Sequence, residues 1–149
     1  MNIFKKIYCR IFQLGFYIAL PLLPYREPQI CHSIEEIPSI LKDKQKKSIL
    51  IVTDKGIRKL NIITKLEEIL KINNIKFSIY DDTSPNPTVQ NVEDARKMYL
   101  ENDCDCLVAV GGGSSIDCAK ALGARIARPK KSLKQLKGLL KELFLNFHI

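Results

Sequence analysis

Three consecutive glycines, Gly111, Gly112 and Gly113, follow an apolar run and precede Ser114 and Asp117. Because glycine has no Cβ, the backbone of such a loop can come very close to a ligand. Ser114 and Asp117 have the spacing of a capping box, which predicts that a helix begins at Ser114. Free N–H groups at a helix start bind anions, most often phosphate. We therefore predict that the loop binds phosphate, with a tight strand-to-helix turn without ligand as the alternative.

An aspartate, Asp54, ends an earlier apolar run in the sequence IVTDKG. A carboxylate there could accept hydrogen bonds from both hydroxyls of an adenosine ribose, and it would repel a 2′-phosphate. From local sequence alone, a turn or cap role for Asp54 is an equal alternative. The glycine loop itself lacks the lysine of the nucleoside-triphosphate P-loop and the spacing of the G-x-G-x-x-G fingerprint. Neither of those two nucleotide-binding motifs therefore describes it.

Alternating strands and helices position these residues. Continuous apolar runs predict buried strands at residues 48–53, 76–81 and 106–110. Apolar residues at helical spacing predict one helix that ends near Ile72, a second that contains Val92, Ala95, Met98 and Tyr99, and a third over residues 114–127. Ser33 is predicted to cap a short helix. The alternation predicts an α/β fold with a parallel sheet, in which ligands bind at the carboxyl ends of the strands.

Composition narrows the classes of function. The 149 residues are 46% hydrophobic and 27% charged, which is typical of one globular domain and not of a disordered chain. The net charge of +8 is spread along the sequence, so we expect no nucleic-acid partner. Five irregularly spaced cysteines predict reduced thiols in a cytoplasmic protein.

The N-terminal segment, residues 1–28, has a composition of its own. Lys5, Lys6 and Arg10 precede a nearly uncharged run over residues 11–24, as in a secretory signal. No small-x-small cleavage site follows, two prolines interrupt the run, and it is short for a bilayer span. We expect an amphipathic segment that docks on the protein, with contact to a membrane surface as the alternative.

Three sequence stretches together resemble a known family. VTDKG, PNPT and GGGSSIDCAK, in this order and separation, resemble the N-terminal domain of the iron-containing (group III) alcohol dehydrogenases, relatives of glycerol dehydrogenase and dehydroquinate synthase. The family pattern Gly-Gly-Gly-Ser-x-x-Asp-x-Ala-Lys is met in full at residues 111–120. The resemblance extends over about residues 26–140. It implies that residues 29–149 form a Rossmann-like domain, a parallel sheet with flanking helices similar to that of dehydroquinate synthase, that binds NAD(P).

The resemblance also implies roles for individual residues. The three glycines and Ser114 would hold the cofactor pyrophosphate, and Asp54 would lie beside the adenosine ribose. Asp117 and Lys120 would support the loop and its helix, and Asn86 in the PNPT turn would lie near the cofactor. The carboxylate of Asp54 favours NAD over NADP, because it would repel a 2′-phosphate.

The sequence also departs from the family. There, one aspartate and three histidines of a helical C-terminal domain hold a divalent metal, iron or zinc, beside the substrate pocket. This sequence has two histidines, His32 and His148, and neither lies in such a motif. Its ending, ELFLNFHI, does not resemble the continuation of the family, so we expect a truncated product without the metal domain.

The function implied is that of an NAD(P)-dependent alcohol dehydrogenase, in which hydride passes between nicotinamide and an alcohol or aldehyde. Only the cofactor-binding half would be present, and it would be inactive alone. Family members are often homo-oligomers. One alternative is a non-catalytic nucleotide-binding fragment with an exposed apolar tail face of Leu133, Leu136, Leu140, Leu143 and Phe144. The other is a relative of glycerol dehydrogenase.

Overall fold

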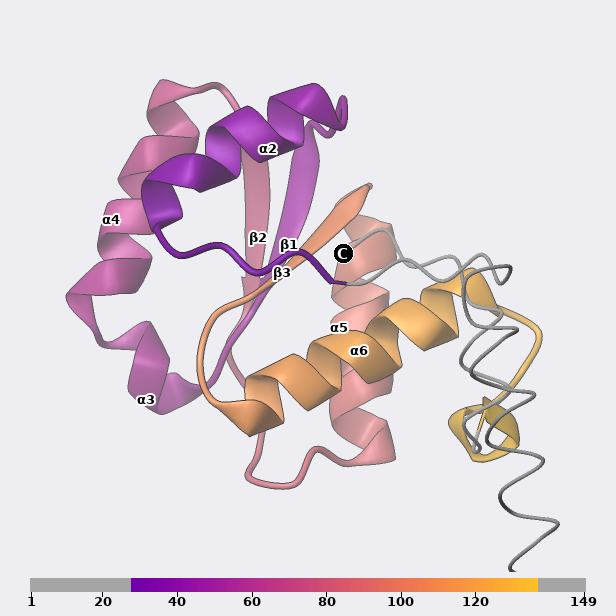
Figure 1. The fold of residues 1–149 in the computed structure, drawn as a ribbon. Coiled ribbons are helices and arrows are strands. Elements are labelled where there is room, and N and C mark those ends of the chain that lie inside the picture. Colours follow the sequence, from indigo (N-terminus) through magenta and orange to yellow (C-terminus); the bar gives the residue numbers. More distant parts are fainter. Residues whose placement is uncertain (1–27, 137–149) are drawn as a thin grey trace, which may run out of the picture.

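A parallel sheet of three strands lies at the centre of residues 28–136, which are the residues that the computed structural model describes (Figure 1). The strands are β1 (Ser48–Val52), β2 (Lys76–Tyr80) and β3 (Cys106–Ala109), in the order β2-β1-β3. All three strands and their parallel arrangement confirm the prediction, and each ends one residue before the predicted end. The α/β fold class is therefore confirmed.

The register of the sheet brings three loops together. Val52 pairs with Tyr80 on one side and with Ala109 on the other, so the three strands end at the same level. The pairing continues beyond the strands, because Thr53 N–H donates to the Tyr80 carbonyl at 2.8 Å and Val110 N–H to the Val52 carbonyl at 3.0 Å. The segments that follow β1, β2 and β3 consequently begin side by side.

Helices cover both faces of the sheet, which explains why β1 is apolar throughout. Ile49 and Ile51 pack with α2 (Ile37–Asp43) and α4 (Asn61–Ile72) on one face. Leu50 and Val52 pack with α5 (Val89–Glu101) and α6 (Gly113–Ala127) on the other. All five residues of β1 are buried, as expected for a central strand with helices on both sides (Figure 1).

Short helices complete the described part. Ser33 caps the 3-10 turn η2 (Ile34–Glu36), as predicted, and α3 (Lys55–Arg58) and η3 (Leu133–Leu136) follow β1 and α6. The predicted exposure of Leu133 is wrong, because this side chain is half-buried against the α5 and α6 core. Leu140, Leu143 and Phe144, for which exposure is also predicted, and the N-terminal segment lie outside the described residues.

Cys31, Cys104, Cys106 and Cys118 are free thiols in the structure. Between residues 28 and 136, none of the helices combines the length and apolar character that crossing a membrane requires.

Candidate functional site

The first glycine of the loop after β3 is required by the backbone. Gly111 has a φ of +144°, which side chains of L-residues rarely allow. A Cβ added at this position would lie 2.6 Å from Ser115 Oγ. By contrast, a Cβ added at Gly112 or at Gly113 would meet no atom within 4 Å. The last two glycines therefore leave open space at the start of α6.

The start of α6 differs from the prediction. The helix begins at Gly113, with Gly112 as its N-cap in extended conformation and no side-chain capping hydrogen bond. The predicted capping box of Ser114 and Asp117 is therefore wrong, because Ser114 already lies in the first turn. Without a capping side chain, the first N–H groups of α6 receive no side-chain hydrogen bond, and an anion could accept hydrogen bonds from them.

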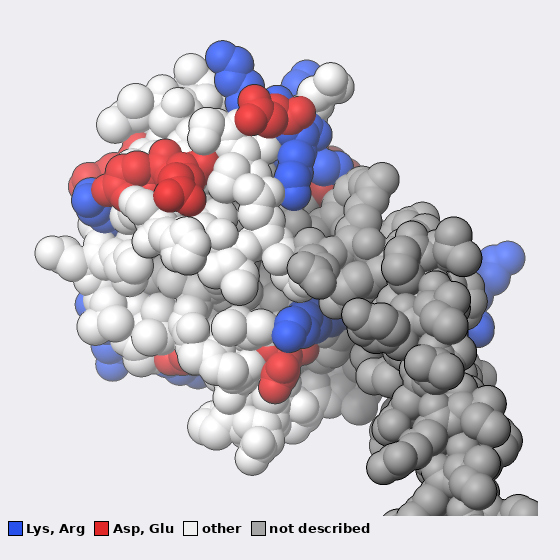
Figure 2. All heavy atoms as spheres, in the orientation of Figure 1, with Lys and Arg blue, Asp and Glu red and all other residues white. Residues whose placement is uncertain are grey.

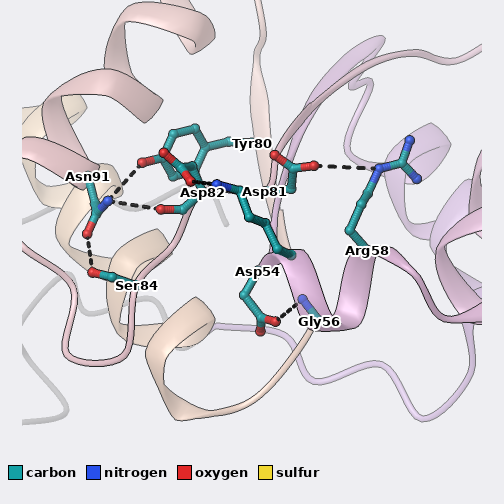
Figure 3. Close-up of polar contacts among 9 residues, drawn as sticks. Asp54, Gly56, Arg58, Tyr80, Asp81, Asp82, Ser84 and Asn91 are labelled. Carbon is teal, nitrogen blue, oxygen red and sulfur yellow. Dashed lines mark hydrogen bonds and ion pairs between the residues drawn. The ribbon is translucent and has the colours of Figure 1, made fainter.

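Asp54 connects the loop after β1 to the glycine loop. Its Oδ1 accepts a hydrogen bond from Gly56 N–H at 2.9 Å (Figure 3). It accepts a second from Ile57 N–H at 3.0 Å and so caps α3. Its Oδ2 accepts a hydrogen bond from Ser115 Oγ at 3.5 Å. The local cap role that the sequence left open is thus real, and the second carboxylate oxygen still faces the glycine loop.

The loop after β2 is held by Asn91, which the sequence analysis did not single out. Its Oδ1 accepts from Ser84 Oγ at 2.6 Å, and its Nδ2 donates to Tyr80 Oη at 3.2 Å and to the Asp82 carbonyl at 3.0 Å (Figure 3). Oδ1 also accepts from Thr88 N–H at 3.0 Å. Asn91 and Thr88 also form a capping box at the start of α5. The spacing Thr-x-x-Asn could have indicated this box, but not the contacts with Tyr80 and Ser84.

These loops surround a cavity of about 480 Å³. It is lined by Asp54, Lys55, Gly56, Asp81, Asp82, Thr83, Ser84, Pro85 and Ser114. An isolated antiparallel bridge between Asp54 and Asp82 joins the first two loops. We call this space the loop cavity, and it has the side chain of Asp54 and the first turn of α6 in its walls.

Several charged side chains around the loop cavity form ion pairs. Lys55 Nζ lies 2.6 Å from Asp82 Oδ1. Arg58 forms ion pairs with Glu67 and, at 4.0 Å, with Asp81, the latter drawn in Figure 3. On the face drawn in Figure 2, basic and acidic side chains both occur, and uncharged residues cover most of the described surface.

The structure brings together part of the predicted cofactor site. Asp54 and Ser114 line the loop cavity, and Gly111, directly before Gly112 and Gly113, packs beside Ser115 and Asp54 Oδ2. Asn86 is exposed, has a φ of 57° and does not line the loop cavity. Asp117 is exposed on α6.

Lys120 lies apart from that cluster, in a second groove. This groove has a volume of about 1030 Å³ and is lined by β3 together with parts of η2, α2, α4 and α6. Gly111 also lines it, so the glycine loop separates the two spaces.

No three His, Cys, Asp or Glu side chains within residues 28–136 are grouped so that they could hold a metal ion. His32 is exposed, and His148 lies outside the described residues.

Comparison with known proteins gives one consistent result. The sequence profile of the family described as iron-containing alcohol dehydrogenase matches residues 29–144. Alcohol dehydrogenase 4 of Saccharomyces cerevisiae is 36% identical over 108 residues, which are 72% of this chain and 27% of that protein.

Solved structures agree. An alcohol dehydrogenase from Oenococcus oeni matches with a TM-score of 0.66 and 28% identity, over 70% of this chain and 28% of that chain. An iron-containing alcohol dehydrogenase from Thermotoga maritima matches with a TM-score of 0.62 and 31% identity, over 72% and 30% of the two chains. The part that matches is thus between a quarter and a third of these relatives' length.

Proposed function

The chain belongs to the iron-containing alcohol dehydrogenase family, and on that premise we propose that its residues 29–149 form the NAD(P)-binding domain of such an enzyme. The whole activity we propose is the transfer of hydride between the cofactor and a small alcohol or aldehyde. The observation that carries the proposal is the open, uncapped start of α6 next to the carboxylate of Asp54.

The pyrophosphate would be held by the backbone of Gly112, Gly113 and Ser114. The empty positions beside the two glycines are the space that a Cβ would otherwise fill, so phosphate oxygens can approach the N–H groups there. The positive end of the α6 dipole favours negative charge at the same place. Gly111 has a different role, since it allows the loop to pack against Ser115.

The adenosine ribose would lie at the loop cavity. Asp54 and Ser114 both line this cavity, so a ligand that reaches from the glycine loop to Asp54 must enter it. The Oδ2 atom of Asp54 is the one available to accept from ribose hydroxyls, because Oδ1 caps α3. A 2′-phosphate at this position would meet the carboxylate, and we therefore propose NAD rather than NADP.

The bound nicotinamide would supply or accept the hydride. The part of the chain described here contributes binding and orientation of the cofactor, and it contains no cluster that fits the metal of the family. The proposed function of these residues is therefore cofactor binding, and the alcohol or aldehyde substrate belongs to the activity of a full-length enzyme. The cytoplasmic location stays a prediction.

A fluorescence titration tests the proposal. The full chain is titrated with NADH and then with NADPH, and the titrations are repeated with Gly112→Val. Saturable NADH binding that the variant loses is the expected result, because valine fills the space beside the first turn of α6. Absence of NADH binding to a chain that is folded by circular dichroism would refute it. Binding without alcohol-dependent NADH formation would identify these residues as a nucleotide-binding module without catalysis of its own.

A further inference from the structure

Lys55 and Asp82 face each other at the loop cavity. Their charged atoms are 2.6 Å apart, and both residues line the cavity together with Asp54 and Ser114. The antiparallel bridge between Asp54 and Asp82 fixes the two loops that carry the pair. Lys55 is therefore directed toward Asp82 at the same space in which we placed the adenosine ribose.

The charges that line this cavity disfavour an additional phosphate. Its lining residues include the carboxylates of Asp54, Asp81 and Asp82, and among them Lys55 is the basic residue. Arg58 stands outside that lining and pairs with Glu67 and Asp81. A phosphate monoester carries between one and two negative charges at neutral pH, so it needs a cation that is not already paired.

We propose that Asp82 is a second determinant of specificity for NAD, which acts by holding Lys55 in an ion pair and so denying this cation to the 2′-phosphate of NADP. This inference rests on the proposed function, since it requires the adenosine ribose to lie in the loop cavity. The Asp82 carboxylate, which accepts a hydrogen bond from the Lys55 ammonium, raises the pKa of Lys55. The role differs from that of Asp54, which would contact the ribose itself.

Variants of Asp82 and Lys55 test this role. Asp82→Asn removes one carboxylate and frees Lys55, so the affinity for NADPH should rise about three- to tenfold while that for NADH changes less than about twofold. The gain should depend on Lys55 and shrink in the double variant Lys55→Gln with Asp82→Asn. Glu101→Gln is the matched control, because it removes one negative charge from an exposed ion pair with Lys97 at the far end of α5.

The experiment is a set of NADH and NADPH fluorescence titrations of the full chain and these variants at low salt, with circular dichroism of each. A higher NADPH-to-NADH affinity ratio in Asp82→Asn, but not in Glu101→Gln or the double variant, supports the inference. If wild type binds NADH and the ratio is unchanged in Asp82→Asn, or changes equally in Glu101→Gln, the inference is wrong and the proposed function stands. If folded wild type binds no NADH, both are wrong.

Discussion

The hydroxyl of Ser115 lies 3.5 Å from Oδ2 of Asp54, and this contact joins the first turn of α6 to the loop after β1. Gly111 packs against the same pair, because a Cβ at this position would lie 2.6 Å from the hydroxyl and 3.5 Å from the carboxylate oxygen. Two loops that are far apart in sequence therefore form one surface. Substitutions at these positions can separate the contribution of packing from that of binding.

Gly111→Ala should destabilise the fold. The Cβ collides with Ser115 and the positive φ is strained for alanine, which together cost about 1–3 kcal/mol in the free energy of unfolding. Urea unfolding followed by circular dichroism measures this difference. Gly113→Ala is the matched control, since its Cβ meets nothing within 4 Å and it lies in a helix, and it should leave stability equal or higher. Equal stability of the two variants would contradict the described packing.

Asp54→Asn should alter cofactor binding more than stability. An asparagine side-chain oxygen can still cap α3, so the free energy of unfolding should change by less than about 1 kcal/mol. Loss of the negative charge should weaken NADH binding and reduce the preference for NADH over NADPH. Titration with both cofactors, together with thermal unfolding, checks this. Asp54→Ala serves for comparison, because loss of the N-cap hydrogen bonds should also lower the free energy of unfolding by about 1 kcal/mol. A preference for NADH that is unchanged in Asp54→Asn would argue against a ribose contact.

The strands could be predicted from sequence because burial on both faces of the sheet requires a continuous apolar run. Ile49 to Val52 pack alternately into the two cores between the sheet and its helices, so this part of β1 is apolar without interruption. Sequence alone also placed Asp54 at the end of this strand and the glycines at the end of β3. The common level of the strand ends then follows from the parallel register.

The start of α6 and the loop after β2 could not be predicted in the same way. Residue preferences favour a serine cap, whereas the extended backbone of Gly112 takes that position and moves the helix start to Gly113. The role of Asn91 depends on Tyr80 and Ser84, which only the fold brings within hydrogen-bonding distance. The predicted position of Asn86 near the cofactor also depends on tertiary structure, and it stays a prediction.

Stability should fall at alkaline pH, partly through Tyr99. Burial raises the pKa of Tyr99 to about 12, and the neighbouring Cys106, Asp105 and Cys104 add to the effect. An unfolded tyrosine has a pKa of about 10, so its contribution is complete below about pH 10 and is lost as the pH rises toward about 12. Urea unfolding of wild type and Tyr99→Phe at about pH 7 and about pH 11 measures it. The variant should lose less stability between the two conditions, and an equal loss would contradict the assignment.

Asn91→Ala should both destabilise the fold and weaken NADH binding. The variant leaves the Tyr80 hydroxyl, Ser84 hydroxyl and Asp82 carbonyl without the amide that joins them, at a cost of about 2 kcal/mol in the free energy of unfolding. Because Asp82 and Ser84 line the loop cavity, NADH affinity should fall as well. Asn102→Ala, which removes one exposed side-chain contact with the Met98 carbonyl at the other end of α5, is the matched control. Urea unfolding and NADH titration of both variants measure the free energy of unfolding and the affinity for NADH. If Asn102→Ala costs as much stability and affinity, Asn91 does not organise the cavity wall.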